Sequence, residues 1–261
     1  MIPTREAEAL YGEVDLAFKG LNRVAQAISG IREKNWGTIR FGVFPASVRT
    51  ITPQIIMEFH ALHRQSKFHV TSMRSSNLVE AIASRQLDVA ICSIPGERSE
   101  VESTFIHSGY AVCVVPSDHR LASRATIDIY DLEGERFISL GVGDKSKQII
   151  DGVFEQAGVG REIVFTCEQA DIALALVAMG AGVAIMGPIP AFNNMANDAV
   201  RIIPFTPYTE FRLWMLTPKG TRRSDLVDCF AEFCIDSVKV KLDQLNRTFD
   251  KGSHPDHRIA P

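Results

Sequence analysis

Polar residues stand at four places where a predicted strand gives way to a predicted helix: residues 46–47, 75–77, 141–146 and 167–169. The first turn of a helix leaves backbone amides unpaired and carries the positive end of the helix dipole, so it attracts anions. Ser76 and the neighbouring amides are therefore predicted to bind an anion. Asp144 or Glu168 is predicted to bind a cationic group.

Helix capping is the alternative explanation for the same residues. Asn77 stands three residues before Glu80, a spacing typical of a capping box. Asp144, Ser146 and Glu168 can likewise cap the helices that they precede. For any single residue both explanations stay open. The whole set favours a ligand site only if all four places face one region.

No sequence motif for catalysis is present. The chain lacks a G-x-S-x-G elbow, an H-E-x-x-H pair and a P-loop. Gly180 and Gly182 precede a predicted strand instead of following one, which argues against a dinucleotide-binding fingerprint. Cys167 has no neighbouring histidine base, so a buried structural thiol is expected there. We therefore expect no catalytic residue and no cofactor.

Histidines offer two further candidates. His60 and His63 lie three residues apart on a predicted helix, but no third ligand is near in the sequence, so a solvated helix face is favoured over a metal site. Asp118 and His119 resemble part of a catalytic dyad. They follow a predicted strand directly, where a turn is the favoured interpretation.

Predicted strands and helices alternate in two rounds. The first round comprises strands 38–44, 69–73 and 88–94 with helices 52–64 and 78–86; the second comprises strands 136–142, 162–167 and 182–189 with helices 146–156 and 172–179. Corresponding strands are 94 positions apart, from Val89 to Val183 and from Val70 to Val164. The pattern predicts an α/β protein with two similar, Rossmann-like βαβαβ lobes.

Two longer apolar segments join the two rounds. Residues 109–121 and 210–220 each read as a strand that leaves one lobe and enters the other, and an amphipathic helix over 224–245 follows. Two such strands make a hinge. Because parallel α/β sheets bind ligands beyond the carboxyl ends of their strands, we expect the four polar places to face a cleft between the lobes.

Composition indicates a globular protein of a reducing compartment. Lys and Arg total 28 against 31 Asp and Glu, which gives a net charge of -3. A chain with this charge is not expected to bind the phosphate backbone of a nucleic acid by electrostatic attraction alone. The five cysteines are odd in number, lack C-x-x-C spacing and stand in apolar runs, so buried thiols are expected. We see no signal peptide and no run of about 20 apolar residues, and expect a cytoplasmic location.

The first 36 residues read as one long helix with a heptad seam. Its apolar residues recur at alternating steps of four and three: Leu10, Val14, Ala17, Leu21, Val24, Ile28 and Ile31. A seam of this kind packs against a partner helix. The residues predicted to mediate dimerisation are Leu10, Val14, Leu21, Val24 and Ile28.

The order of the segments resembles that of a known family. After the lead-in "PTREAEALY" come "GTIRFGVFPASVRTITPQIIMEFH", "RSSNLVEAIASRQLDVAI", "VVPSDHRLA", "DLEGERFISLG" and "ALVAMGAGVAIMGP". Over residues 2–240 the chain is similar to the linker helix and effector-binding domain of LysR-type transcriptional regulators. Within that family it looks somewhat like the regulators of opine and basic amino acid catabolism.

The resemblance implies a periplasmic-binding-protein type 2 fold, a small amino-acid-like or carboxylate effector in the cleft, and homodimers or tetramers. It also implies that the winged helix-turn-helix of the family is missing here, so that only the parent protein would bind DNA. The implied domains are a linker helix over 1–36, lobe 1 over 37–112 and 209–245, lobe 2 over 113–208, and a flexible tail over 246–261.

The same resemblance, applied position by position, implies that the effector contacts residues at the predicted helix starts, the places already selected from the sequence. The predicted effector-binding residues are Ala46, Ser47, Ser75, Ser76, Asn77, Gly141, Gly143, Asp144, Ser146, Cys167, Glu168 and Gln169. An effector that bridges both lobes would act by stabilising their closed arrangement.

Two other functions stay open on the sequence. A solute-binding protein of a transporter shares the implied fold but requires export. An enzyme on the same bilobal fold requires a nucleophile or an acid–base pair in the cleft. Both leave the heptad helix unexplained.

Overall fold

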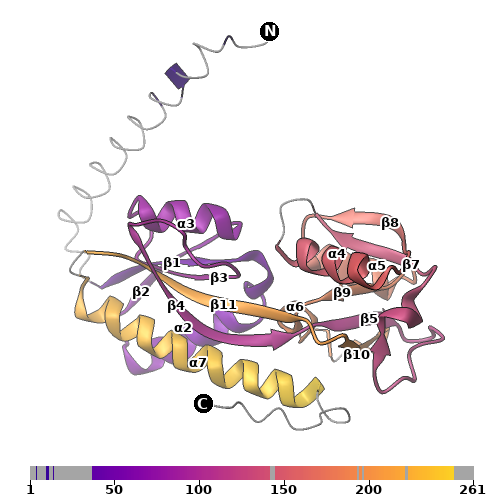
Figure 1. Ribbon diagram of the computed structural model, residues 1–261. Coiled ribbons are helices and arrows are strands. Elements are labelled where there is room, and N and C mark those ends of the chain that lie inside the picture. Colours follow the sequence, from indigo (N-terminus) through magenta and orange to yellow (C-terminus); the bar gives the residue numbers. More distant parts are fainter. Residues whose placement is uncertain are drawn as a thin grey trace, which may run out of the picture.

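The computed structural model describes Thr4, Leu10, Tyr11, Val14 and residues 37–141, 145–192, 194–195, 197–220 and 223–249. Two lobes lie side by side, and the chain passes between them where strands of the two lobes follow one another closely (Figure 1). Within the described residues no helix is long and apolar enough to cross a membrane.

Lobe 1 is built on a five-stranded sheet in the order β2-β1-β3-β11-β4. The strands are β1 (Thr38–Val43), β2 (Lys67–Ser72), β3 (Val89–Cys92), β4 (Val101–Tyr110) and β11 (Glu210–Pro218). The first three pair in parallel, whereas β11 is antiparallel to both of its neighbours. Helices α2 (Ile51–Leu62), α3 (Ser75–Ala83) and α7 (Asp225–Phe249) cover this sheet, and a short 3-10 helix, η1 (Pro45–Ser47), follows β1.

Lobe 2 contains a four-stranded sheet in the order β6-β10-β5-β9 and the parallel pair β7-β8. Its strands are β5 (Val112–Pro116), β6 (Ile127–Asp128), β7 (Arg136–Leu140), β8 (Glu162–Cys167), β9 (Ala184–Met186) and β10 (Val200–Thr206). Its helices are η2 (Ile129–Leu132), α4 (Lys145–Ala157), α5 (Ala170–Ala178) and α6 (Pro188–Phe192). A parallel bridge between Phe137 and Val183 brings β7 beside the start of β9.

In the described part of the chain, two passages run between the lobes, at neighbouring points. One passage runs from β4 to β5 through Ala111, and the other runs from β10 to β11. The two passages are hydrogen-bonded to each other, since the Ala111 amide donates to the Thr209 carbonyl at 2.9 Å. Glu210 then pairs with Tyr110 at the start of lobe 1. The predicted pair of hinge strands is therefore confirmed, although each is interrupted at the crossing.

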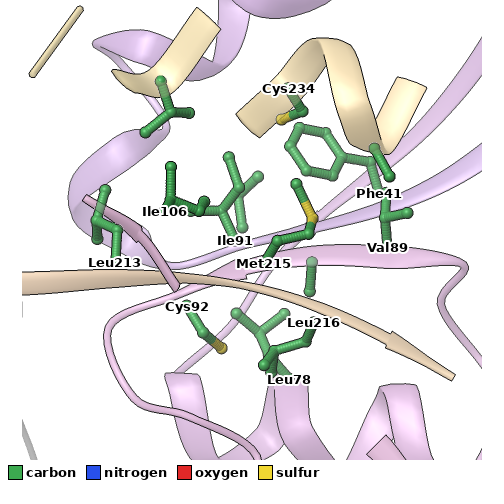
Figure 2. Packing of buried hydrophobic residues seen from close by; sticks show 14 of the residues in the cluster. Phe41, Leu78, Val89, Ile91, Cys92, Ile106, Leu213, Met215, Leu216 and Cys234 are labelled. Carbon is green, nitrogen blue, oxygen red and sulfur yellow. The ribbon is translucent and has the colours of Figure 1, made fainter. Parts of the chain in front are cut away.

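The packing of lobe 1 explains why the sequence of β3 is an unbroken run of apolar residues. All four residues of β3 are buried because helices lie on both faces of the sheet. Figure 2 shows the alternation along β11 and β3: Met215 and Ile91 lie toward Cys234 of α7, whereas Leu216 and Cys92 lie on the other side of the sheet, toward Leu78 of α3.

Phe230 of α7 is the aromatic centre of this core. Its ring is completely buried and meets the rings of Phe41, Phe59 and Phe68, each at a centroid distance of 5.0 Å in edge-on geometry. These contacts fix α7 against α2 and the sheet, so the C-terminal helix is an integral part of lobe 1.

Several sequence predictions differ from the structure in detail. The helix predicted to begin at Leu78 begins at Ser75, and the helix predicted to end at Leu245 continues through Phe249, into the segment assigned to a tail. Strand β4 was not predicted as a separate element. Cys229 is exposed, which contradicts the expectation of five buried thiols, whereas the other four cysteines are buried.

Most of the predicted heptad helix lies outside the described residues, including Leu21, Val24 and Ile28. The described positions Leu10 and Val14 are helical and exposed. The dimerisation role of the seam stays a prediction.

Arg161 is held inside lobe 2 by two rings and a carboxylate. Its side chain is 9% exposed and ion-paired with Asp151. Its guanidinium carbon lies 4.6 Å from the centroid of the Phe137 ring and 4.3 Å from that of Phe154. Burial by itself would raise the pKa of Asp151, but the hydrogen bonds and charges of Lys147 and Arg161 outweigh it and lower that pKa.

The substitution Phe230→Ala is expected to lower the free energy of unfolding by about 3–5 kcal/mol, because it leaves a cavity among three rings that cannot collapse onto it. Urea denaturation followed by circular dichroism measures the change. Phe105→Ala is the control, since Phe105 is 45% exposed and leaves no closed cavity. Equal losses in the two variants would contradict this account of the core.

The substitution Asp151→Asn is expected to cost about 1–3 kcal/mol at neutral pH, less than for a fully buried pair because Asp151 is partly exposed. The lowered pKa means that this stabilisation is present above the ordinary carboxyl value of about 4 and is lost as the pH falls through the lower folded-state value. Urea midpoints of variant and native protein should therefore converge in acid.

The control for Asp151 is Glu210→Gln, which removes the exposed ion pair with Arg212 and should cost less than about 1 kcal/mol. An Asp151→Asn protein as stable as the native one at neutral pH would show that the two rings alone hold Arg161.

Candidate functional site

A cleft of about 540 Å³ lies between the two lobes. Residues at the starts of α3, α4 and α5 line it, together with residues of η1. Six of the residues selected from the sequence are among those lining it: Ala46, Ser75, Ser76, Ser146, Glu168 and Gln169. The structure therefore brings the four predicted places to one cleft.

Helix α3 presents an uncapped N-terminus to the cleft. Its N-cap position is Arg74, which makes no side-chain hydrogen bond to the first turn. The Ser75 hydroxyl is within 2.9 Å of the Ser93 hydroxyl and accepts a hydrogen bond from the Ser93 amide at 3.2 Å. The exposed Ser76 hydroxyl has no protein partner among the described residues. The first turn of α3 thus offers amides and one hydroxyl to an anion.

The capping alternative is wrong for Asn77. Because α3 begins at Ser75, Asn77 is its third residue and cannot be its N-cap. Its side chain is exposed and does not line the cleft. At the other lobe, Gln169 is the N-cap of α5 and also makes no side-chain capping bond.

Three other selected residues lie beside the cleft without lining it. Ser47 is fully buried, and its hydroxyl donates to the Phe44 carbonyl at 2.8 Å. Cys167 is 6% exposed, and burial raises the pKa of its thiol. Gly141 lies directly under the Glu168 carboxylate. Gly143 and Asp144 lie outside the described residues.

Ion pairs join the two lobes at their facing loops. Arg74 of lobe 1 pairs with Glu168 of lobe 2, and both residues line the cleft. Arg49 of lobe 1 pairs with Asp171 of α5 at 3.6 Å, and neither of these residues lines the cleft. No sequence pattern pointed to Arg74, because its partner stands 94 positions away in the other lobe.

The charges that line the cleft are nearly balanced. The cationic side chains are Arg74, Arg98, Lys145 and Arg212, and the anionic ones are Glu80, Glu97 and Glu168. Arg98 pairs with Glu80 at 2.6 Å, and Arg212 pairs at 2.9 Å with Glu210, which lies outside the lining. The remaining surface is largely apolar, with Phe44, Ile94, Met186, Ile189 and Leu213 among its residues.

The histidine candidates lie elsewhere. His119 is 3.3 Å from the Glu135 carboxylate and accepts the Leu121 amide in a turn, as the turn interpretation predicts. His60 Nδ1 is 3.1 Å from the Ser66 carbonyl, and His63 stacks on Phe59. Among the described residues no group of three or more His, Cys, Asp or Glu could hold a metal ion.

Comparison with known proteins decides the family. A model of the LysR substrate binding domain matches residues 32–239. The chain belongs to this family. The resemblance drawn from the sequence is thereby confirmed, and so is the periplasmic-binding-protein type 2 fold of LysR effector-binding domains.

Curated LysR-family relatives cover most of the chain. The transcriptional activator protein LysR of Escherichia coli (strain K12) is 26% identical over 229 residues, which are 88% of this chain and 73% of that protein. The octopine catabolism/uptake operon regulatory protein OccR of Rhizobium meliloti is 29% identical over 234 residues, which are 88% of this chain and 76% of that protein.

A solved structure shows the same fold. The regulatory domain of CcmR from Synechocystis PCC6803, in complex with 2-PG, superposes with a TM-score of 0.70 at 17% identity. The match covers 78% of this chain and 98% of that one. The chain is thus an effector-binding domain of a LysR-type transcriptional regulator.

Proposed function

We propose that the cleft between the lobes is the effector site of this domain, and that the residues at the starts of α3, α4 and α5 hold the effector. The observation that carries the proposal is the convergence of three helix starts, from both lobes, on one cleft. Its volume of about 540 Å³ lies within the range of small-molecule sites. Ser76 and the first-turn amides of α3 bind an anionic group.

Effector binding acts on the equilibrium between open and closed lobes. A compound that contacts both lobes stabilises the closed arrangement only by its higher affinity for it, and a difference of about 1–3 kcal/mol gives a coupling of about 5- to 150-fold. Rotation about the hinge then changes how subunits are spaced in an oligomer, and with it the placement of the DNA-binding domains of the regulator.

The wider setting is also part of the proposal. The protein acts in the cytoplasm as a homodimer or tetramer joined through the helix of residues 1–36, and its effector is a small amino-acid-like or carboxylate compound. The heptad seam supports the oligomer, and the buried thiols support a reducing compartment. Similarity to a regulator of octopine catabolism and uptake supports the effector class.

A thermal-shift screen with octopine, L-arginine, L-lysine and small aromatic and dicarboxylic acids should find compounds that raise Tm. For such a compound, Ser76→Ala is expected to weaken binding by about 3- to 10-fold through the loss of one hydrogen bond. Isothermal titration calorimetry measures the Kd. Ser84→Ala, at the other end of α3, is the matched control. Unchanged affinity in Ser76→Ala for every compound found would contradict the placement of the site.

Removal of residues 1–36 is expected to lower the association state, because it removes the heptad seam through which two chains are proposed to pair. Sedimentation velocity measures the change. In the intact chain, Leu21→Asp should have the same effect, whereas Gln26→Asp, which lies off the seam, should not. An association state that survives both the truncation and Leu21→Asp would mean that another surface holds the oligomer.

A further inference from the structure

One ion pair closes the cleft from side to side. Arg74 stands directly before α3 in lobe 1, and Glu168 stands just before the N-cap of α5 in lobe 2. Among the described lining residues, this is the one ion pair whose members come from different lobes. An effector that lies between the two loops must therefore replace it or bind beside it.

The two members of the pair have different surroundings. Arg74 is next to the first-turn amides of α3, so the positive end of the helix adds to its attraction for an anion. The Glu168 carboxylate lies over the backbone of Gly141, where an added Cβ would come within 2.5 Å of Oε1. A glycine at that position makes room for the carboxylate, and any side chain there would displace it.

We propose that the effector is a zwitterion that exchanges with this ion pair; the inference rests on the proposed effector site. The carboxylate of the effector replaces Glu168 at Arg74 and the first turn of α3. Its cationic amine replaces Arg74 at Glu168. Every charge then keeps an opposite partner when the lobes close around the ligand.

Compounds with a single charge do not satisfy this arrangement. A simple carboxylate pairs with Arg74 but leaves Glu168 unpaired in a closing cleft, and a simple amine leaves Arg74 unpaired. An unpaired charge that loses its water is costly. Two of the other lining cations already have carboxylate partners, since Arg98 pairs with Glu80 and Arg212 pairs with Glu210.

The apolar lining of the cleft indicates the chemical nature of the uncharged part of the ligand. Phe44 and Ile94 of lobe 1 and Met186 of lobe 2 contribute apolar surface to the same cleft. The effector class is therefore an α-amino acid or amino-acid derivative with an aliphatic or aromatic body.

Matched compounds test the inference directly. Calorimetry on the full chain compares L-norleucine with hexanoate and pentylamine, and L-phenylalanine with 3-phenylpropanoate and 2-phenylethylamine. Within each set only the charged groups differ. At least one amino acid is expected to bind about tenfold or more tightly than both of its single-charge analogues, since a charge that loses its water around the bound ligand without gaining a partner costs about this factor.

Two substitutions separate the roles of the pair. Glu168→Gln keeps the shape of the side chain and removes its charge, so the preference for the amino acid over the matched carboxylate should fall to about twofold or less. Arg74→Met should weaken the amino acid and the carboxylate alike. The control is Arg49→Gln, which removes the other interlobe ion pair without touching the cleft and should leave the preference unchanged.

The outcomes distinguish this inference from the proposed function. Three results would each overturn the zwitterion proposal while leaving the proposed effector site intact. The first is that carboxylates bind as tightly as the matched amino acids. The second is that the preference for the amino acid persists in Glu168→Gln, and the third is that it is lost equally in Arg49→Gln. The same holds if no amino acid binds while other acids of the screen do. If no compound of the whole screen binds, the effector site itself fails as well.

Discussion

The structure depends on one constraint: within the residues that the structure describes, the chain crosses between its lobes at two neighbouring points. The hydrogen bond from the Ala111 amide to the Thr209 carbonyl ties the crossings together, so the lobes can rotate about a single line. Beside this line the lobes are packed closely. Ile189 of α6 belongs to the buried core of lobe 1, and Pro188 fills the space beside Gly109. Relative motion is therefore concentrated at the cleft.

Different forces hold the two sides of the cleft. Near the crossings, the lobes are held by buried apolar side chains. These side chains stay buried as long as α6 stays packed against lobe 1. At the facing loops the contact consists of ion pairs, and Arg74 and Glu168 are 55% and 62% exposed. Ion pairs of such exposure contribute about 0–1 kcal/mol each. In the proposed mechanism, such weak contacts leave the population of the closed arrangement open to control by ligand binding.

Much of the fold could be predicted because it follows from local rules. Buried parallel strands read as short apolar runs, as Val89–Cys92 does, and glycines end helices, as Gly158 does at a φ of 66°. Strand β4 escaped prediction because it lies at a sheet edge and is half polar, with no strict alternation. The start of α3 was misplaced because Asn77 is a better capping residue than Arg74, yet the structure leaves this end without a side-chain cap.

The candidate site was predictable only in outline. That helix starts face a cleft follows from the topology of α/β sheets, and six selected residues line the cleft. Which way a side chain turns is decided by contacts that the sequence does not show. Ser47 turns inward to the Phe44 carbonyl, and Ser75 is engaged by Ser93. The role of Arg74 depends on a glutamate in the other lobe, so no local pattern could reveal it.

The uncapped starts of α3 and α5 connect the fold to its use. A side-chain cap would satisfy the first-turn amides within the protein and contribute about 1 kcal/mol to stability. Without one, neither the Arg74 nor the Gln169 position supplies that contribution, and amides at the start of α3 stay open toward the cleft. A ligand anion can supply the missing partner only while it is bound. The hydrogen bonds that a side-chain cap would have made in the free protein can instead form with the ligand and add to its binding energy. Ligand binding then favours the arrangement in which both lobes contact the ligand.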